Sequence, residues 1–468
     1  MTADRHGHHM SGTGAEALAH YEQALDDLLF FRPQVAASAQ AVLASSPRSV
    51  MGQALAAYLG VLGTEERDAA AARKVFAGFR AGLDEEALTR RERMHLAAAG
   101  AWLDGDLHGA GRLLADLTVA FPRDVLALFA GHQSDFLTGD AQRLRDRVGG
   151  ALGAWSEDDP HHGPLLGMYA FGLEETGHYE RAEEAGLAAL ARHPRDVWGI
   201  HGVVHTYEMR GRFTDGIRFL DARTDAWAAG SLLTVHNWWH YALYALELGD
   251  TARVLEIYDS ALHHDASASA AMELLDAAAL LWRLYLAARE DQSARWSRLA
   301  DAWESRQDGA HYAFNDVHAV MAYVGADRIG QAERLVEDRQ KWVAGATPGV
   351  TNRAMTADIG VPVCRALIAY GQHDHGRAAD LLLPLRHRLH TFGGSHAQRD
   401  AIQRTLVEAT LRAGRTELAR ALLSERIQLR PVCPYNWSAQ ARLEERLGDP
   451  GRAALARERA AAQAAGAR

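Results

Sequence analysis

The sequence contains very little cysteine and almost no lysine. Its 468 residues include two cysteines, Cys364 and Cys433, and two lysines, Lys74 and Lys341. Two cysteines cannot build a disulfide framework, and these two lack the spacing of a cysteine zinc site, so a reducing cytoplasm fits best. A lysine Schiff base, and with it most pyridoxal phosphate chemistry, would have to use one of two lysines, and we do not expect it.

Long apolar runs and a positive net charge are also missing. No stretch approaches the about 20 apolar residues that cross a bilayer, and residues 1–18 lack the basic and apolar parts of a signal peptide. The net charge of -10 opposes sequence-independent binding to nucleic acid. The sequence has no phosphate-binding loop, no dinucleotide fingerprint and no nucleophile elbow. We therefore expect a cytoplasmic protein without membrane or nucleic-acid partners, and neither nucleotide-driven nor serine-hydrolase chemistry.

What the sequence does contain is a repeat of Gly-x-Tyr-x-x-Ala type with a proline about half a repeat later. Three copies carry it best: Gly177, Tyr179, Ala182 and Pro194; Gly105, Leu107, Ala110 and Pro122; Gly414, Thr416, Ala419 and Pro431. With each glycine at position 15 of a 34-residue unit, the predicted unit starts are Arg91, Val125, Gly163, Val197, Val235, Asp400 and Pro434. Less regular units are predicted near Ser49, Leu275, Ala313 and Ile359.

Each unit reads as a helical hairpin. In the unit from Val197, apolar residues at Ile200, Val203 and Val204 follow helical spacing, and a second helix starts after the break at 210–212. One hairpin cannot bury its apolar face alone, so neighbours must stack on it. The sequence predicts an all-α solenoid of about eleven hairpins over residues 21–450. Residues 1–20 are expected to form a flexible arm and the start of the first helix, and residues 451–468 a capping helix and tail.

The period and the punctuation resemble the tetratricopeptide repeat from about Ser49 to Ala462. Longer segments resemble the tetratricopeptide repeat protein 38 family: GMYAFGLEETGHYERAEEAG (167–186), HGVVHTYEMRGRF (201–213), HNWWHYALYALELGD (236–250), FNDVHAVMAYVGA (314–326) and GGSHAQRD (393–400). The resemblance implies a right-handed superhelix in which positions 2, 5, 9 and 12 of each unit line the concave face. The family is largely without an assigned activity, so the resemblance implies the fold and says little about function.

Histidines are concentrated on this expected concave face. On the implied frame, His201, His205 and Glu208 fall at positions 5, 9 and 12 of one unit, and the next unit carries His236 at position 2 and His240 at position 6. An i, i+4 histidine pair can present two imidazoles to one metal ion. The two neighbouring pairs, His201 with His205 and His236 with His240, are therefore a candidate site for a divalent metal, Zn or Fe. Histidines that only donate hydrogen bonds or move protons are the alternative.

Further candidates lie on the same face or in the segments that resemble the family. We assign His201, His205, Glu208, Asp316 and His318 to catalysis, where Asp316 would orient an imidazole. The residues assigned to substrate binding are His132, Asp135, Glu174, Trp239, His396 and Arg399. Arg399 offers a planar fork for a carboxylate or phosphate. Ser395 is interpreted as a helix N-cap.

Two functions remain open. In the first, the superhelix closes its concave face into a histidine-rich channel that binds a small polar or anionic molecule, with hydrolase or lyase chemistry by acid-base or metal-assisted steps. In the second, the chain is a non-catalytic scaffold whose groove holds a peptide or protein. The candidate groove residues are His, Glu, Trp and Asp rather than Lys, Arg and Asn, which favours the first. A homodimer is left open.

Overall fold

The computed structural model describes residues 2–287 and 291–465, and within these ranges the ordered elements are helices. The first part of the chain forms α1 (Ala15–Leu29), α2 (Val35–Ser45), α3 (Val50–Leu62), α4 (Glu66–Ala81), α5 (Arg90–Leu103), α6 (Leu107–Ala120), α7 (Val125–Leu137) and α8 (Ala141–Ala151). The middle forms α9 (His162–Glu175), α10 (Tyr179–Arg192), α11 (Val197–Met209), α12 (Phe213–Asp221), α13 (Thr224–Trp227), α14 (Thr234–Glu247), α15 (Thr251–Ile257), α16 (Ala271–Leu286) and α17 (Ser293–Glu304). The last part forms α18 (Ala313–Gly325), α19 (Ile329–Gly345), α20 (Thr351–Met355), α21 (Val361–Gly371), α22 (His375–Leu382), α23 (His396–Arg412), α24 (Thr416–Leu429), α25 (Pro434–Arg446) and α26 (Pro450–Ala464). The prediction of an all-α repeat solenoid is confirmed.

The repeated glycines and acidic residues mark the ends of the helices. Gly105, Gly177 and Gly414 sit between the two helices of their hairpins with φ of +86°, +79° and +70°, a conformation that side chains with a Cβ disfavour. At the next boundary, Asp124 and Asp196 cap α7 and α11 by accepting hydrogen bonds from backbone N–H groups of the first turn. These repeats therefore carry local signals for where a helix stops and the next one starts.

Most predicted unit starts lie within one residue of an observed helix start. The helices α7, α11, α18 and α25 begin at Val125, Val197, Ala313 and Pro434, as predicted. Two starts were placed too late: α16 begins at Ala271 rather than near Leu275, and α23 begins at His396 rather than at Asp400. For α23 the reason is the cap, because Ser395 and Gln398 form a reciprocal capping box that opens the helix earlier. The interpretation of Ser395 as an N-cap is confirmed.

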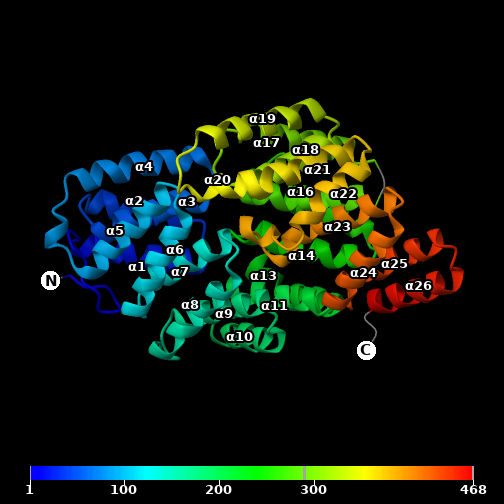
Figure 1. Cartoon of the computed structure of the whole chain (residues 1–468). Coiled ribbons are helices and arrows are strands. Elements are labelled where there is room, and N and C mark those ends of the chain that lie inside the picture. The colour runs from blue at the N-terminus through cyan, green and yellow to red at the C-terminus, as the bar shows by residue number, and fades with distance from the viewer. Residues whose placement is uncertain (1, 288–290, 466–468) are drawn as a thin grey trace.

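The array curls until distant repeats meet (Figure 1). The loop between α3 and α4 contacts the start of α18, where Asn315 donates to the Thr64 carbonyl over 3.0 Å. The N–H of Thr351, in α20, donates to the Gly105 carbonyl over 2.8 Å. Figure 1 shows α20 beside the blue helices α3 and α4 of the first repeats. Because of this closure, first helices from different parts of the chain surround a common interior.

The two ends pack onto the array. Met10 is buried, and Ser11 donates its backbone N–H to Glu92 over 2.6 Å. His6 Nε2 lies 3.0 Å from His161 Nδ1. At the other end, α26 packs against α25. Across the described residues, we find no helix with the length and apolarity that a membrane span requires.

Candidate functional site

Three consecutive first helices, α9, α11 and α14, form the floor of the candidate site. Glycines let α9 and α11 approach closely, because a Cβ on Gly167 would lie 2.6 Å from the Gly199 nitrogen and one on Gly202 would lie 2.9 Å from the Ala170 Cβ. On the other side, the Tyr244 hydroxyl of α14 donates to the Val204 carbonyl of α11 over 2.5 Å. The spacing between α9 and α11 thus depends on glycines that have no side chain, and a buried hydrogen bond connects α11 to α14.

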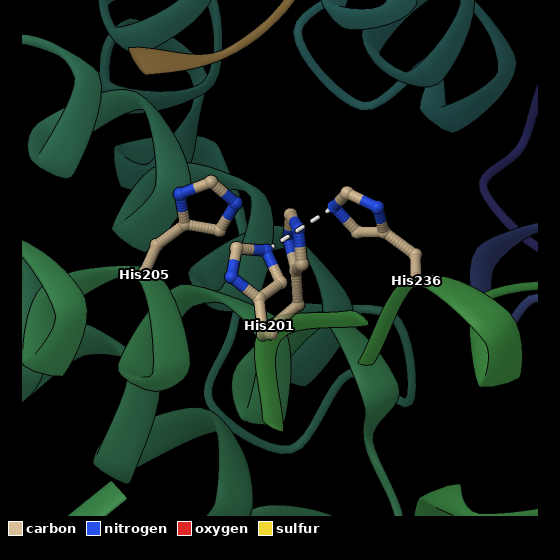
Figure 2. A group of neighbouring side chains, drawn as sticks. His201, His205 and His236 are labelled. Carbon is tan, nitrogen blue, oxygen red and sulfur yellow. Dashed lines mark hydrogen bonds between the residues drawn. The ribbon is translucent and has the colours of Figure 1, made fainter. Parts of the chain in front are cut away.

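Four histidines from α11 and α14 meet between these helices. We refer to His201, His205, His236 and His240 as the His quartet; one ring nitrogen of each lies within 4.8 Å of one ring nitrogen of every other. The Nε2 atoms of His240 and His236 are 3.3 Å apart. Figure 2 shows the His205 and His236 rings turned toward each other from opposite sides, with His201 between them. Three of the four residues are buried, and the His236 side chain is 18% exposed.

Three of the four imidazoles also have a carboxylate beside their second ring nitrogen, Nδ1. The Nδ1 of His236 is 2.7 Å from Asp276 Oδ2, and the Nδ1 of His240 is 3.0 Å from Glu208 Oε2. The Nδ1 of His205 lies 3.3 Å from Glu174 Oε2. At His236 and His240 the hydrogen-bonded carboxylate fixes the tautomer with the proton on Nδ1, so the Nε2 lone pair is free. The carboxylates come from α9, α11 and α16, so helices on both sides orient the rings.

Electrostatics keep part of the quartet neutral. Burial, reinforced by the neighbouring histidines, lowers the pKa of His201 and of His240 well below its usual range. Burial also opposes protonation of His205, but the adjacent Glu174 outweighs it and raises the pKa of His205 overall. Burial raises the pKa of Glu208, against the effect of Arg430, whose guanidinium lies 3.5 Å away. Neutral imidazole is the form that binds a metal.

Several buried polar atoms of the site have no hydrogen-bond partner among the residues that the structure describes. They are both ring nitrogens of His201, the Nε2 of His205 and both oxygens of Glu174. An unpaired polar group in a protein interior costs about 1–3 kcal/mol, so such atoms commonly have a ligand or an ordered water. Trp239 closes one side by stacking on His236, with ring centroids 5.3 Å apart.

The chain returns to this site through α23. The His396 N–H donates to Glu175 Oε1 over 2.7 Å, and Arg399 donates to Glu175 Oε2 over 3.3 Å. The His396 Nδ1 lies 3.9 Å from Glu174 and 3.7 Å from Glu175. Of the predicted substrate-binding residues, Glu174, Trp239, His396 and Arg399 are therefore close to the quartet or to its carboxylates.

The structure places the other candidates in different surroundings. Asp135 forms a buried ion pair with Arg147 at 2.7 Å, and Asp316 forms one with Arg339 at 2.9 Å. Neither aspartate orients an imidazole through these contacts, because each carboxylate is held by a guanidinium. His318 Nδ1 lies 2.8 Å from the Phe314 carbonyl, and burial lowers the pKa of His318 to about 4.

His132 lies beside the quartet rather than in it. Its Nε2 is 3.1 Å from the Met168 carbonyl, and its ring packs edge-on against Trp198 with centroids 5.2 Å apart. Burial lowers the pKa of His132 to about 3. Because one ring nitrogen contacts a carbonyl and the ring packs against aromatic side chains, His132 is part of the protein interior.

Two residues of the site were not among the sequence candidates. Asp276 holds His236, and it also accepts a hydrogen bond from Gln398 of α23 over 3.4 Å. Arg283 is buried with its guanidinium 5.6 Å from the Trp239 ring centre, and it donates to the Ala397 carbonyl. Both interrupt the apolar segment 274–286 of α16. A charged residue inside such a run is the signal that could have identified them, because buried charges need partners.

No protein-family model matches the chain. Solved structures with similar repeats include human IFIT1, as a dimer with m7Gppp-AAAA, at 14% identity over 99% of this chain and 96% of that chain with a TM-score of 0.42. A tetratricopeptide repeat protein from Parabacteroides merdae matches at 13% identity over 64% of this chain and 98% of its own, with a TM-score of 0.33. The Cut9–Hcn1 assembly of the APC/C matches at 12% identity over 96% and 94%, with a TM-score of 0.36. The chain is similar to these tetratricopeptide proteins in its repeats, and scores this low say nothing of what it binds.

Proposed function

We propose that this helical-repeat protein holds a divalent transition metal in the His quartet. The observation that carries the proposal is the pair of facing nitrogens on His236 and His240, 3.3 Å apart. Each ring directs Nδ1 to a carboxylate, so with both rings neutral and Nδ1-protonated neither Nε2 has a hydrogen to share. Two lone pairs facing each other repel unless a cation lies between them.

The separation also fits an ion. Two nitrogens bound to a tetrahedral zinc, each at about 2.05 Å, lie roughly 3.3 Å apart. A set of four imidazoles suits Zn²⁺ or Fe²⁺ better than Mg²⁺ or Ca²⁺, which prefer oxygen. The carboxylates beside three of the rings are the outer partners that orient metal-bound histidines. Both ring nitrogens of His201 lack a partner, which leaves this imidazole free to complete the set.

A small polar or anionic molecule would approach at His236, the exposed edge of the quartet. A metal there would supply a Lewis acid, while Glu208 and Glu174 would hold the rings that they contact in place. Acid-base or metal-assisted chemistry of the hydrolase or lyase kind is the catalytic form of this proposal. It depends on the metal being present.

Metal analysis tests the proposal. Protein purified without a polyhistidine tag, then reconstituted with Zn²⁺ or anaerobically with Fe²⁺, is expected to hold one ion per chain after desalting. The His205→Ala and His240→Ala variants should lose that ion, whereas His178→Ala, an exposed histidine on another surface, should retain it. Metal-free wild-type protein after both reconstitutions, or equal metal in all variants, would refute the site.

The second candidate function is a scaffold for a peptide or protein. A groove of about 470 Å³ supports it, lined by residues of α14, α16, α23, α25 and α26, among them Leu248, Tyr435 and Arg442. Because Arg442 reaches the groove, an Arg442→Glu change is expected to weaken a groove-bound partner and leave quartet metal unchanged. Isothermal titration calorimetry with a partner recovered by affinity capture would measure the change in affinity.

Membership of the tetratricopeptide repeat protein 38 family likewise stays a proposal, supported by the segments quoted above.

A further inference from the structure

A second group of potential metal ligands lies next to the quartet and includes none of its four histidines. One atom each from Glu174, Glu175 and His396 lie within 4.8 Å of one another. Glu174 and Glu175 end α9, and His396 begins α23, 221 positions after Glu175. The curling of the array, rather than any local turn, brings them together.

Three polar atoms of this group are buried without a hydrogen-bond partner among the described residues. Glu174 is fully buried, and within residues 2–287 and 291–465 neither of its oxygens accepts a hydrogen bond; its Oε2 has the 3.3 Å ion-pair contact with His205 Nδ1. The Nδ1 of His396 also lacks a hydrogen-bond partner. The His396 Nδ1 lies 3.9 Å and 3.7 Å from the two carboxylates, beyond the about 3.5 Å that a hydrogen bond spans.

These separations are those of ligands around an ion. Two ligand atoms, each about 2.1 Å from a metal and about 120° apart, lie roughly 3.6 Å from each other. Glu175 is oriented for this role because the His396 N–H and Arg399 each hold one of its oxygens, and every oxygen keeps a further lone pair. Arg399 offsets one of the two negative charges of the glutamates.

We propose that Glu174, Glu175 and His396 form a second cation site that takes a divalent ion of the Mn²⁺ or Fe²⁺ kind. Two carboxylates with one imidazole form a harder ligand set than four imidazoles, so the two sites select different ions. The His396 side chain is 37% exposed, which gives the ion a route from solvent. Glu174 also lies 3.3 Å from His205 Nδ1, so one carboxylate connects the two sites.

Electron paramagnetic resonance with Mn²⁺ tests the site. Wild-type protein whose quartet has been filled with one equivalent of Zn²⁺ is titrated with Mn²⁺, and the loss of the free Mn²⁺ signal gives the stoichiometry and Kd. We expect one bound Mn²⁺ per chain. The Glu175→Gln and His396→Ala variants should weaken this binding about 10-fold or more, since loss of a mere outer-shell partner already costs 10- to 100-fold. Glu180→Gln and His178→Ala, both exposed, are the matched controls.

Zinc content separates this proposal from the first one. Both variants should retain one Zn²⁺, because neither residue contacts a quartet ring, and retained zinc also reports an intact fold. If His396→Ala loses both ions, the milder His396→Gln replaces it. Wild-type protein that binds no Mn²⁺ below millimolar concentration, or variants that bind as wild type does, would overturn the second site and leave the quartet unaffected. A quartet without zinc beside a filled Mn²⁺ site would refute the first proposal only.

Discussion

The Asp276→Asn substitution tests the quartet through a residue that does not touch the metal. Asp276 Oδ2 lies 2.7 Å from His236 Nδ1, and its other oxygen accepts from Gln398. Asparagine keeps the size and one acceptor but removes the charge that makes His236 a stronger ligand. Loss of such a partner typically weakens metal affinity 10- to 100-fold, which is about 1.4–2.7 kcal/mol.

The same loss can be read from stability. At free Zn²⁺ equal to 100 times the wild-type Kd, bound metal adds about 2.7 kcal/mol to the free energy of unfolding. A 10- to 100-fold weaker Kd leaves only about 1.4 to 0.4 kcal/mol of that increment. The metal-dependent part of stability should therefore fall by about 1.3–2.3 kcal/mol.

Competition with a zinc chelator of known affinity gives the Kd, and urea denaturation with and without EDTA gives the metal increment. Measuring the increment removes any direct effect of the substitution on the apoprotein. The control is Asp221→Asn, an exposed aspartate that contacts the Tyr241 hydroxyl. If Asp276→Asn keeps both the wild-type Kd and the wild-type increment, the assignment of Asp276 as an orienting carboxylate is wrong.

Three further predictions concern the fold. Arg91 and His95 hold the pKa of Asp124 well below its usual range despite its burial, so its stabilisation is complete above about pH 4 and is lost as the pH falls toward the folded-state pKa. Asp124→Asn should cost about 3–5 kcal/mol near pH 7 and flatten this acid dependence, measured by urea denaturation from pH 6 to 3; an unchanged acid slope would count against the assignment. Gly414→Ala should destabilise by about 1–2 kcal/mol although a Cβ there meets nothing within 4 Å, because φ is +70°. Gly78→Ala, equally uncrowded inside α4, should instead stabilise by about 0.5–1 kcal/mol, and equal signs for the two glycines in denaturation would contradict the backbone explanation.

Sequence periodicity predicted the repeats because their boundary signals are local. A glycine with positive φ ends a helix, and an aspartate cap starts one, within a few residues of its own position. The predicted helix starts at Val125 and Val197 are therefore correct, as is the start at Pro434, where a proline opens the helix. The start of α23 was missed by four residues although its unit has regular punctuation, because the capping box at Ser395 opens the helix earlier. The start of α16 was also missed by four residues, and its unit has degenerate punctuation. Irregular repeats carry less information about their own register.

Within the candidate site, the sequence also predicted which imidazoles share a helix face. His201 and His205, and likewise His236 and His240, are four residues apart, and the stacking of consecutive units brings the two pairs together. The roles given to these residues, and to Asp316 and His318, stay predictions. The buried pairing of Asp135 with Arg147 could not be read from spacing, because it depends on which helix packs opposite.

The sequence by itself determined an array of helical hairpins and a concentration of histidine on two neighbouring first helices. Only the tertiary structure decided which carboxylate stands behind each ring and which residues face Glu174. The partners from α16 and α23 are the distant ones: Asp276 is 40 positions from His236, and His396 is 221 positions from Glu175. Their approach depends on how far the array curls. Curvature sums small packing rotations over many repeats, so no local pattern specifies it.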